Sequence, residues 1–333
     1  MGWRLEAPRI ALRYWLAPAA GFFAALAFAL CAAQSSAAGL VQPKLIVWGY
    51  GEDTSFNQPR GIAFDPSDGA IYVANTGEHR IEVFSAAGRP ITRFVHRVTL
   101  PDGVVVDGDP AALAFSRSGH LLVADYRALY VDVLDRRGRP VARLPVPAGH
   151  PAAIAVARDG SIYVGTTAEE SKVHRFRADY APAGSWGEQG AGAGRLRSIT
   201  ALAELADGNI AVACARTDVG IQVFTPEGSY VRGFATHELE TGNVSLPSGL
   251  LGTEDGRIWV VDEIRQLIQV YDRDGVFIEA TGGKGIAPGM FMAPSSLAAD
   301  GKGLIAVTDR VSGRFQVMSI STREEVTAGE TKE

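Results

Sequence analysis

A basic residue recurs in the loop after each of six similar apolar runs in the chain. These residues are Arg80, Arg127, Lys172, Arg216, Arg265 and Arg310. Arg60 and Arg197 precede other apolar runs, and we expect them on the same face. Cations that converge around one opening favour anions, so the pattern predicts a site for an anionic ligand or an acidic partner. The alternative is that these are ordinary exposed loop charges, each paired with an acidic residue of its own repeat.

A small side chain, polar in most cases, stands at the end of each of these apolar runs, six residues after a recurring glycine. The positions are Asn75, Asp125, Thr166, Cys214, Asp262 and Asp309. Short polar side chains at a strand end accept hydrogen bonds from loop amides, so we interpret this ring as structural. A functional ring of acidic groups is the alternative. We expect Cys214 to be buried as a small apolar residue.

The histidines form no recognisable metal-binding pattern. They are His79, His96, His120, His150, His174 and His237. A catalytic metal needs about three converging His or carboxylate ligands and an open position. Only His79 and His150 fall on the predicted ligand face, so we predict neither a metal nor another cofactor. No Ser/His/Asp or Cys/His motif is present either.

The elements that carry these residues repeat six times along the chain. The runs read GAIYVAN, GHLLVAD, GSIYVGT, GNIAVAC, GRIWVVD and GLIAVTD, and they begin at Gly69, Gly119, Gly160, Gly208, Gly256 and Gly303. Each is preceded by one short apolar run and followed by a second β-rich run, after which most copies have a turn and a further short run. Four strands in a repeat of 40 to 50 residues are typical of a propeller blade. We therefore predict an all-β, six-bladed propeller of four-stranded antiparallel blades around a central channel.

The sixth repeat lacks its fourth strand, and the N-terminal part of the chain can supply it. Residues 44–50 resemble the outer strands of other repeats, and we predict that they pair beside Arg314–Ser319. This pairing would close the ring and cover its exposed strand edges. The propeller then forms one domain over residues 39–320, followed by a polar tail, 321–333, that we expect to be disordered.

The stretch VANTGEHRIEVF, Val73–Phe84, is similar to the signature of NHL-repeat propellers, whose repeats read like V-A-D-T-G-N-H-R-I-Q-V-F. Partial matches are VVDEIRQLIQVY, VTDRVSGRFQVM and VACARTDVGIQVF, and the resemblance covers about residues 44–320. It implies the propeller fold and leaves function open, because this fold hosts lyases, hydrolases and binding modules.

Two enzyme families of similar fold give more specific expectations. Amidating lyases of this kind place zinc-binding His in segments like P-H-S, whereas this chain has QPRGIAF, LPSGLL and APSSLAA. His150 lies near such a position without companions. Gluconolactonase-like hydrolases hold a divalent cation with a Glu, Asn and Asp set, which we do not find at matching places.

The N-terminal segment has the features of a secretory signal peptide, residues 1–38. Arg4, Arg9 and Arg13 precede an apolar run that ends in small residues, with cleavage predicted after Ala33 or Ala38. An uncleaved membrane anchor is the alternative. We therefore predict an exported protein, periplasmic or extracellular, that meets a membrane only through this segment.

The charge of the chain excludes one class of partner. The sequence has 32 basic and 37 acidic residues, and loss of 1–38 removes three Arg and one Glu, which leaves a net charge of −7. Nucleic acids and anionic membranes call for a basic surface, so we expect neither as a general partner.

Together these features predict a binding or scaffold module. Its partner would be a protein or an anionic small molecule or polysaccharide of the cell envelope, held by the basic loops. The alternative is a metal-dependent lyase or hydrolase with its site at the central channel.

Overall fold

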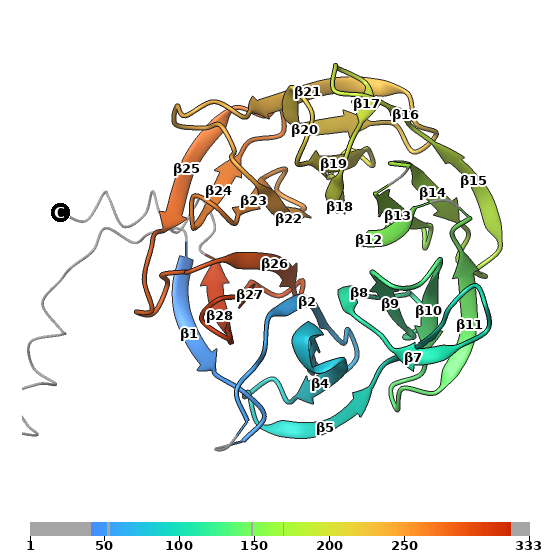
Figure 1. The fold of residues 1–333 in the computed structure, drawn as a ribbon. Coiled ribbons are helices and arrows are strands. Elements are labelled where there is room, and N and C mark those ends of the chain that lie inside the picture. Colours follow the sequence, from blue (N-terminus) through green and yellow to red (C-terminus); the bar gives the residue numbers. More distant parts are fainter. Residues whose placement is uncertain (1–40, 52–53, 148, 169, 321–333) are drawn as a thin grey trace, which may run out of the picture.

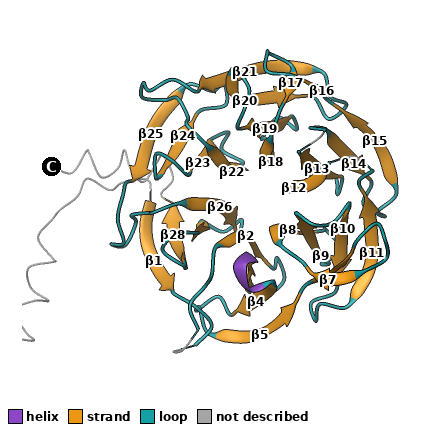
Figure 2. Ribbon diagram, in the orientation of Figure 1, coloured by secondary structure: helices purple, strands orange, loops and turns teal. Residues whose placement is uncertain are grey.

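The computed structural model describes residues 41–51, 54–147, 149–168 and 170–320. The predicted signal peptide, 1–38, and the predicted tail, 321–333, lie outside these residues. Six four-stranded antiparallel sheets stand around a central axis as the blades of a propeller (Figures 1 and 2). The prediction of an all-β, six-bladed fold is confirmed. Over the described part of the chain, no helix is long and apolar enough to cross a membrane.

Each blade contributes one strand to each of four concentric layers. The innermost strands are β2 (Pro59–Phe64), β8 (Pro110–Phe115), β12 (His150–Val156), β18 (Ile199–Glu204), β22 (Pro247–Gly252) and β26 (Pro294–Ala299). The second strands are β3 (Ile71–Asn75), β9 (Leu121–Asp125), β13 (Ile162–Thr167), β19 (Ile210–Cys214), β23 (Ile258–Asp262) and β27 (Leu304–Asp309). The third strands are β4 (Arg80–Phe84), β10 (Tyr130–Leu134), β14 (Val173–Phe176), β20 (Val219–Phe224), β24 (Leu267–Tyr271) and β28 (Arg314–Ile320). The outermost strands are β5 (Pro90–Val95), β11 (Pro140–Pro145), β15 (Pro182–Trp186), β21 (Tyr230–Thr236), β25 (Phe277–Gly282) and β1 (Val41–Val47).

Short elements decorate the connections between blades. A hairpin of β6 (Arg97–Thr99) and β7 (Val105–Asp107) leads from the first blade to the second. A parallel pair of β16 (Glu188–Gln189) and β17 (Arg195–Leu196) leads from the third to the fourth. One 3₁₀ turn, η1 (Thr76–Glu78), joins β3 to β4. The repeat pattern did not predict these pieces, because they lie in the connections, where the six copies differ most.

The second strands show why the repeat is so visible in the sequence. β3, β9, β19 and β23 are buried along their whole length. The facing blades cover both sides of each sheet, so these strands are continuous apolar runs rather than alternating ones. The outermost strands are instead largely exposed, as in β5.

The ring closes where β1 pairs with β28, as predicted. The register is antiparallel, with Val41 opposite Ile320 and Val47 opposite Phe315. The observed strand, 41–47, begins and ends three residues earlier than the predicted 44–50. It ends there because the chain turns back at Gly49, which bridges to Ser55 before β2 begins.

Aromatic packing seals this junction between the last blade and the first. The rings of Phe56, Phe84 and Phe315 lie 5.3–5.9 Å apart, centroid to centroid, in tilted or edge-on contact. Phe315 belongs to β28 and Phe84 to β4, so the contact joins strands about 230 residues apart in sequence. Hydroxyl groups add polar links across the same junction, since Ser295 Oγ donates to Pro59 O at 3.0 Å.

Truncation of Phe315 tests how much the closure contributes to stability. Phe315→Ala should lower the free energy of unfolding by about 3–5 kcal/mol, because it leaves a cavity between the first and last blades. Urea denaturation measures this change. The control Ile91→Ala removes an exposed side chain on an outer strand and should change stability by less than about 0.5 kcal/mol. Equal effects of the two substitutions would show that the junction is not tightly packed.

Candidate functional site

The loops that join the second strand of each blade to the third lie on one side of the ring, together with the connections from outermost strands to the next innermost strands. We call this side the channel-mouth face. The innermost strands surround a channel of about 600 Å³. Aliphatic side chains line its length, and its polar lining at the channel-mouth face includes Arg60, Tyr126, Thr167 and Glu263.

The ring of strand-end side chains lies directly beneath this face. Asn75, Asp125, Thr166, Cys214, Asp262 and Asp309 are all fully buried. Asp262 accepts hydrogen bonds from the amides of Ser245, at 2.6 Å, and Ile264, at 3.1 Å. Asp309 likewise accepts one from the amide of Ala293 at 2.8 Å. In blades 5 and 6, these carboxylates hold the incoming connection against the blade.

A second buried polar ring lies in the third strands and was missed in the sequence. Its members are Glu82, Asp132, His174, Gln222, Gln269 and Gln316. Gln222 Nε2 donates to Arg195 O and its Oε1 accepts from the amide of Gly194, both at 2.7 Å. Gln316 makes the same two bonds to the connection between blades 5 and 6: its Oε1 accepts from the amide of Gly289, and its Nε2 donates to Met290 O. A polar residue in the middle of each third run, as in RFQVM, is the signal that could have found this ring.

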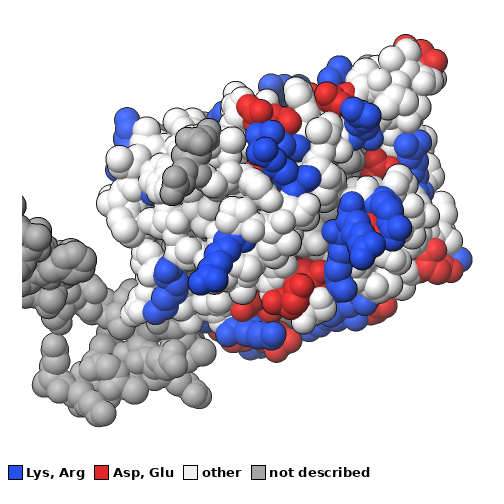
Figure 3. All heavy atoms as spheres, turned by 90° about the horizontal axis from the view of Figure 1, so that it is seen from below, with Lys and Arg blue, Asp and Glu red and all other residues white. Residues whose placement is uncertain are grey.

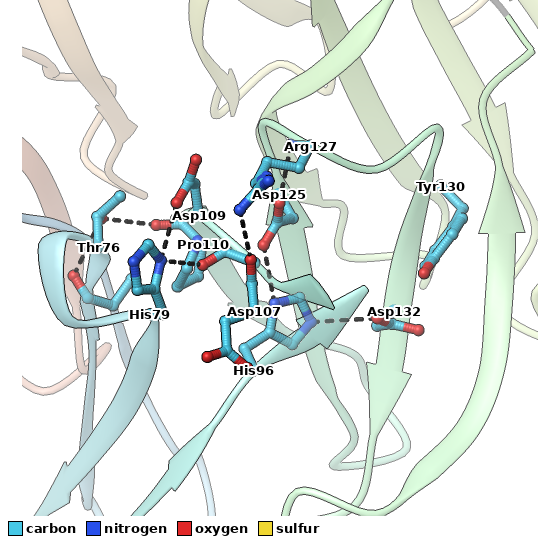
Figure 4. Close-up of polar contacts among 12 residues, drawn as sticks. Thr76, His79, His96, Asp107, Asp109, Pro110, Asp125, Arg127, Tyr130 and Asp132 are labelled. Carbon is cyan, nitrogen blue, oxygen red and sulfur yellow. Dashed lines mark hydrogen bonds and ion pairs between the residues drawn. The ribbon is translucent and has the colours of Figure 1, made fainter. Parts of the chain in front are cut away.

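In blade 2 the group of the incoming connection that the two rings hold is a histidine side chain rather than a backbone amide. His96 follows β5 and is buried between two carboxylates, with Nδ1 2.9 Å from Asp125 Oδ2 and Nε2 3.1 Å from Asp132 Oδ2 (Figure 4). Burial alone would lower the pKa of His96. The hydrogen bonds and charges of Asp125 and Asp132 outweigh it and raise the pKa to about 9. His96 is therefore an imidazolium at neutral pH that fastens the connection to blade 2.

Three of the predicted ligand-face cations are neutralised by neighbouring carboxylates. Arg80 pairs with Glu82 at 2.8 Å, and Lys172 pairs with Glu170 at 2.7 Å. Arg310 pairs with Glu263 of the neighbouring blade. These ion pairs reduce the charge that the residues can offer to a ligand.

Two further predicted ligand-face residues, His79 and Arg265, are held by the loops around them. His79 Nδ1 lies 3.0 Å from Asp109 Oδ1 and 2.8 Å from Gly108 O (Figure 4). The guanidinium of Arg265 donates to backbone carbonyls at Glu238 and Glu240 and lies 3.7 Å from Asp262. Both side chains serve to connect loops.

Arg60, Arg127 and Arg216 have no carboxylate partner among the described residues, and the same holds for Arg197. The Arg60 guanidinium lies 5.4 Å from the centre of the Tyr126 ring. Arg127 Nη1 donates to the backbone carbonyl of Asp107, at 2.8 Å. Arg216 is exposed, and Arg197, also exposed, lies close to it because Ser198 O accepts a hydrogen bond from Ala215 N. We call Arg60, Arg127 and Arg216 the unpaired arginines.

The described residues contain no cluster of side chains suited to holding a metal ion. No three His, Cys, Asp or Glu side chains among them could hold a metal ion together. His150 lies in blade 3 with Nδ1 3.4 Å from Ala128 O, and His79 is in blade 1. Burial raises the pKa of the Cys214 thiol to about 11, which keeps it protonated at neutral pH.

The outer wall of the ring carries a mixed charge. On the side shown in Figure 3, basic and acidic side chains lie among one another. Elsewhere on the ring, Arg97 pairs with Asp107 within the β6–β7 hairpin, and Arg139 pairs with Asp135 in the turn between β10 and β11. The side seen in Figure 3 therefore has no surface of a single charge.

Comparison with known proteins finds two likenesses, one to a sequence repeat and one to a fold. The NHL repeat profile matches residues 56–84, which contain the motif of blade 1. No curated protein matches the chain significantly.

Solved structures match the fold over most of the chain. A protein of unknown function from Bacteroides thetaiotaomicron is 16% identical with a TM-score of 0.62, over 82% of this chain and 72% of that one. A gluconolactonase from Xanthomonas campestris is 17% identical with a TM-score of 0.58, over 80% of this chain and 86% of that one. A streptogramin B lyase is 14% identical with a TM-score of 0.61, over 83% and 98%. At these identities the likeness concerns the fold alone.

The buried imidazolium predicts a specific pH dependence of stability. The folded pKa of His96, about 9, lies above the ordinary value of about 6.5. Its contribution is therefore complete below pH ~6.5 and is lost as the pH rises through ~9, on the order of 3 kcal/mol at most. Unfolding by urea between pH 6 and 10 should show this loss. His96→Gln should be less stable at pH ~6 and should lack this pH-dependent loss, whereas the same slope in both proteins would contradict the assignment.

Proposed function

We propose that this chain, a six-bladed propeller that carries an NHL repeat, is a binding platform that holds an acidic or anionic partner on its channel-mouth face. The observation that carries the proposal is the set of unpaired arginines. Arg60, Arg127 and Arg216 have no carboxylate partner among the described residues, whereas Arg80, Lys172 and Arg310 on the same face do. A guanidinium without a partner keeps its charge and its donors available to a ligand.

The framework beneath these arginines favours recognition. Asp125 accepts a hydrogen bond from the amide of Arg127 at 2.8 Å, which fixes the backbone that carries the guanidinium. Arg60 is the second residue of the innermost strand β2, and its guanidinium lies over the Tyr126 ring. Cations on a rigid support lose less conformational entropy when they bind.

The nature and place of the partner extend this proposal. We propose a protein, or an anionic small molecule or polysaccharide of the cell envelope, met after export to the periplasm or the cell exterior. Export depends on residues 1–38, which lie outside the described residues. The net negative charge of the chain favours a local contact at the unpaired arginines over general attraction to polyanions.

The alternative, a metal-dependent lyase or hydrolase, lacks a supporting constellation. Among the residues that the structure describes, no three His, Cys, Asp or Glu side chains, His150 included, could hold a metal ion together. The likeness to a gluconolactonase and to a streptogramin B lyase concerns the fold. We derive no catalytic step from it.

Charge reversal of the unpaired arginines tests the proposal. With a labelled oligoglutamate peptide as probe, Arg60→Glu/Arg127→Glu/Arg216→Glu should weaken binding by about tenfold or more, as measured by fluorescence anisotropy. The matched control reverses three exposed cations on the opposite face, Arg89→Glu/Arg137→Glu/Lys302→Glu. It changes net charge by the same amount and should alter binding by less than about twofold. Equal losses would reveal non-specific charge attraction, and no loss in the first variant would remove this face as the site.

A further inference from the structure

Five large apolar side chains are exposed on the channel-mouth face, in the sector made by blades 5 and 6 and the connections that enter and leave them. They are Trp48, 48% exposed, Leu239, 94%, Ile264, 63%, Ile286, 65%, and Val311, 58%. We call them the apolar arc. Most other large apolar side chains with such exposure lie on the outermost strands, apart from Val104 and Val105 beside and within the β6–β7 hairpin. A contiguous apolar patch on a soluble protein marks an interaction surface.

An ion pair between neighbouring blades lies beside two members of the arc, Ile264 and Val311. Glu263 of blade 5 binds the guanidinium of Arg310 of blade 6. Ile264 and Val311 are the next residues in the chain. The ion pair therefore fixes the two loop tips beside each other.

A second guanidinium brings Leu239 into the same sector. Arg265 follows Ile264 in the chain, and its two terminal nitrogens donate to the carbonyls of Glu238 and Glu240. Leu239 stands between these two carbonyls. Arg265 thus fastens the connection that carries Leu239 to the loop that carries Ile264.

A third guanidinium fixes the remaining two members. Arg314 is completely buried, and it donates to Ile286 O at 2.5 Å and to Met290 O at 2.7 Å. The Trp48 ring lies over it, with its centre 4.8 Å from the guanidinium carbon. Arg314 therefore holds both Ile286 and Trp48 next to the base of the loop that carries Val311.

We propose that the apolar arc and the unpaired arginines form one composite surface, which binds a protein segment that presents apolar side chains beside carboxylates. This inference rests on the proposed function and specifies its partner. The arginines beside the arc are bonded within the fold: Arg310 to Glu263, and Arg265 and the buried Arg314 to loop carbonyls. Arg60, Arg127 and Arg216 belong to other blades, namely blades 1, 2 and 4. One partner can therefore place its apolar side chains on the arc and its carboxylates on the arginines.

The charges around the arc favour a protein over an anionic membrane. Glu238 and Glu240 are exposed on either side of Leu239. A lipid surface of negative charge would meet these carboxylates at the most exposed apolar residue of the face, which costs free energy. A polypeptide segment can place its own negative charges away from them.

Three short labelled peptides separate the two parts of the surface. They consist of Glu–Glu–Leu, Glu–Glu–Ser and Lys–Lys–Leu repeats, and anisotropy measures their binding to the mature chain. We expect the Glu–Glu–Leu peptide to bind about tenfold more tightly than either of the others. The variant Leu239→Ser/Ile264→Ser/Val311→Ser should bind the Glu–Glu–Leu and Glu–Glu–Ser peptides equally. The control Ile91→Ser/Val141→Ser/Val276→Ser removes exposed side chains from outer strands and connections and should keep the preference.

The possible failures are distinguishable. Equal binding of the Glu–Glu–Leu and Glu–Glu–Ser peptides by the unchanged protein would overturn the role of the arc and leave the arginine site standing. Equal binding of the Glu–Glu–Leu and Lys–Lys–Leu peptides would overturn the proposed function itself. Co-sedimentation with phosphatidylglycerol vesicles that the arc variant loses, without any peptide preference, would assign the surface to a membrane. Thermal unfolding of each variant, followed by circular dichroism, checks that the fold is retained.

Discussion

The antiparallel pairing of β1 with β28 is the interaction on which the other features depend. Blade 6 receives its fourth strand from the opposite end of the described chain, with Val47 opposite Phe315 and Val41 opposite Ile320. Without that strand, β28 would present an unpaired edge, and the junction with blade 1 would lose Val47 and the support for Phe56. The channel and its mouth exist only because the circle of blades is complete. Any site assembled from several blades therefore depends on this closure.

Buried polar side chains hold the connections between blades in place, which apolar packing alone cannot do. They fix irregular connections whose amides would otherwise lack partners. Asp262 and Gln316 accept hydrogen bonds from two different connections, and His96 replaces a loop amide with a charged ring between Asp125 and Asp132. Blades 1, 2, 4, 5 and 6 thus anchor the loop that arrives from the previous blade, which positions the loop tips without extending the core. This arrangement lets loop tips vary while the strands stay the same.

The fold could be predicted from the sequence because the information is local and repeated six times. A run such as GRIWVVD contains the turn glycine, the buried strand and the anchoring carboxylate within seven residues. The predicted end of β1 was three residues too late. The strand ends where the chain turns at Gly49, and this turn depends on the bridge from Gly49 to Ser55, which has no counterpart in the sequence repeats. The ligand face was predicted only as a set of charges. Which cations are neutralised depends on contacts between blades, such as Arg310 with Glu263, 47 positions apart in the chain.

Those contacts between blades also explain how one face can hold two kinds of surface. A guanidinium that binds a neighbouring carboxylate or carbonyl is no longer available to bind a ligand. It links two loops of the protein instead. Arg265, Arg310 and Arg314 act in this way, and the residues that they position are apolar and exposed. Apolar side chains on free loops would collapse onto nearby surface, whereas fastened tips keep them directed outward. Because the ordering of these tips is completed on folding, a partner need not supply it on binding. The use of the basic residues therefore divides this face into two sectors. In one sector, arginines that are bonded within the fold hold the exposed apolar side chains in place. In the other sector, arginines without a carboxylate partner are available to attract anions.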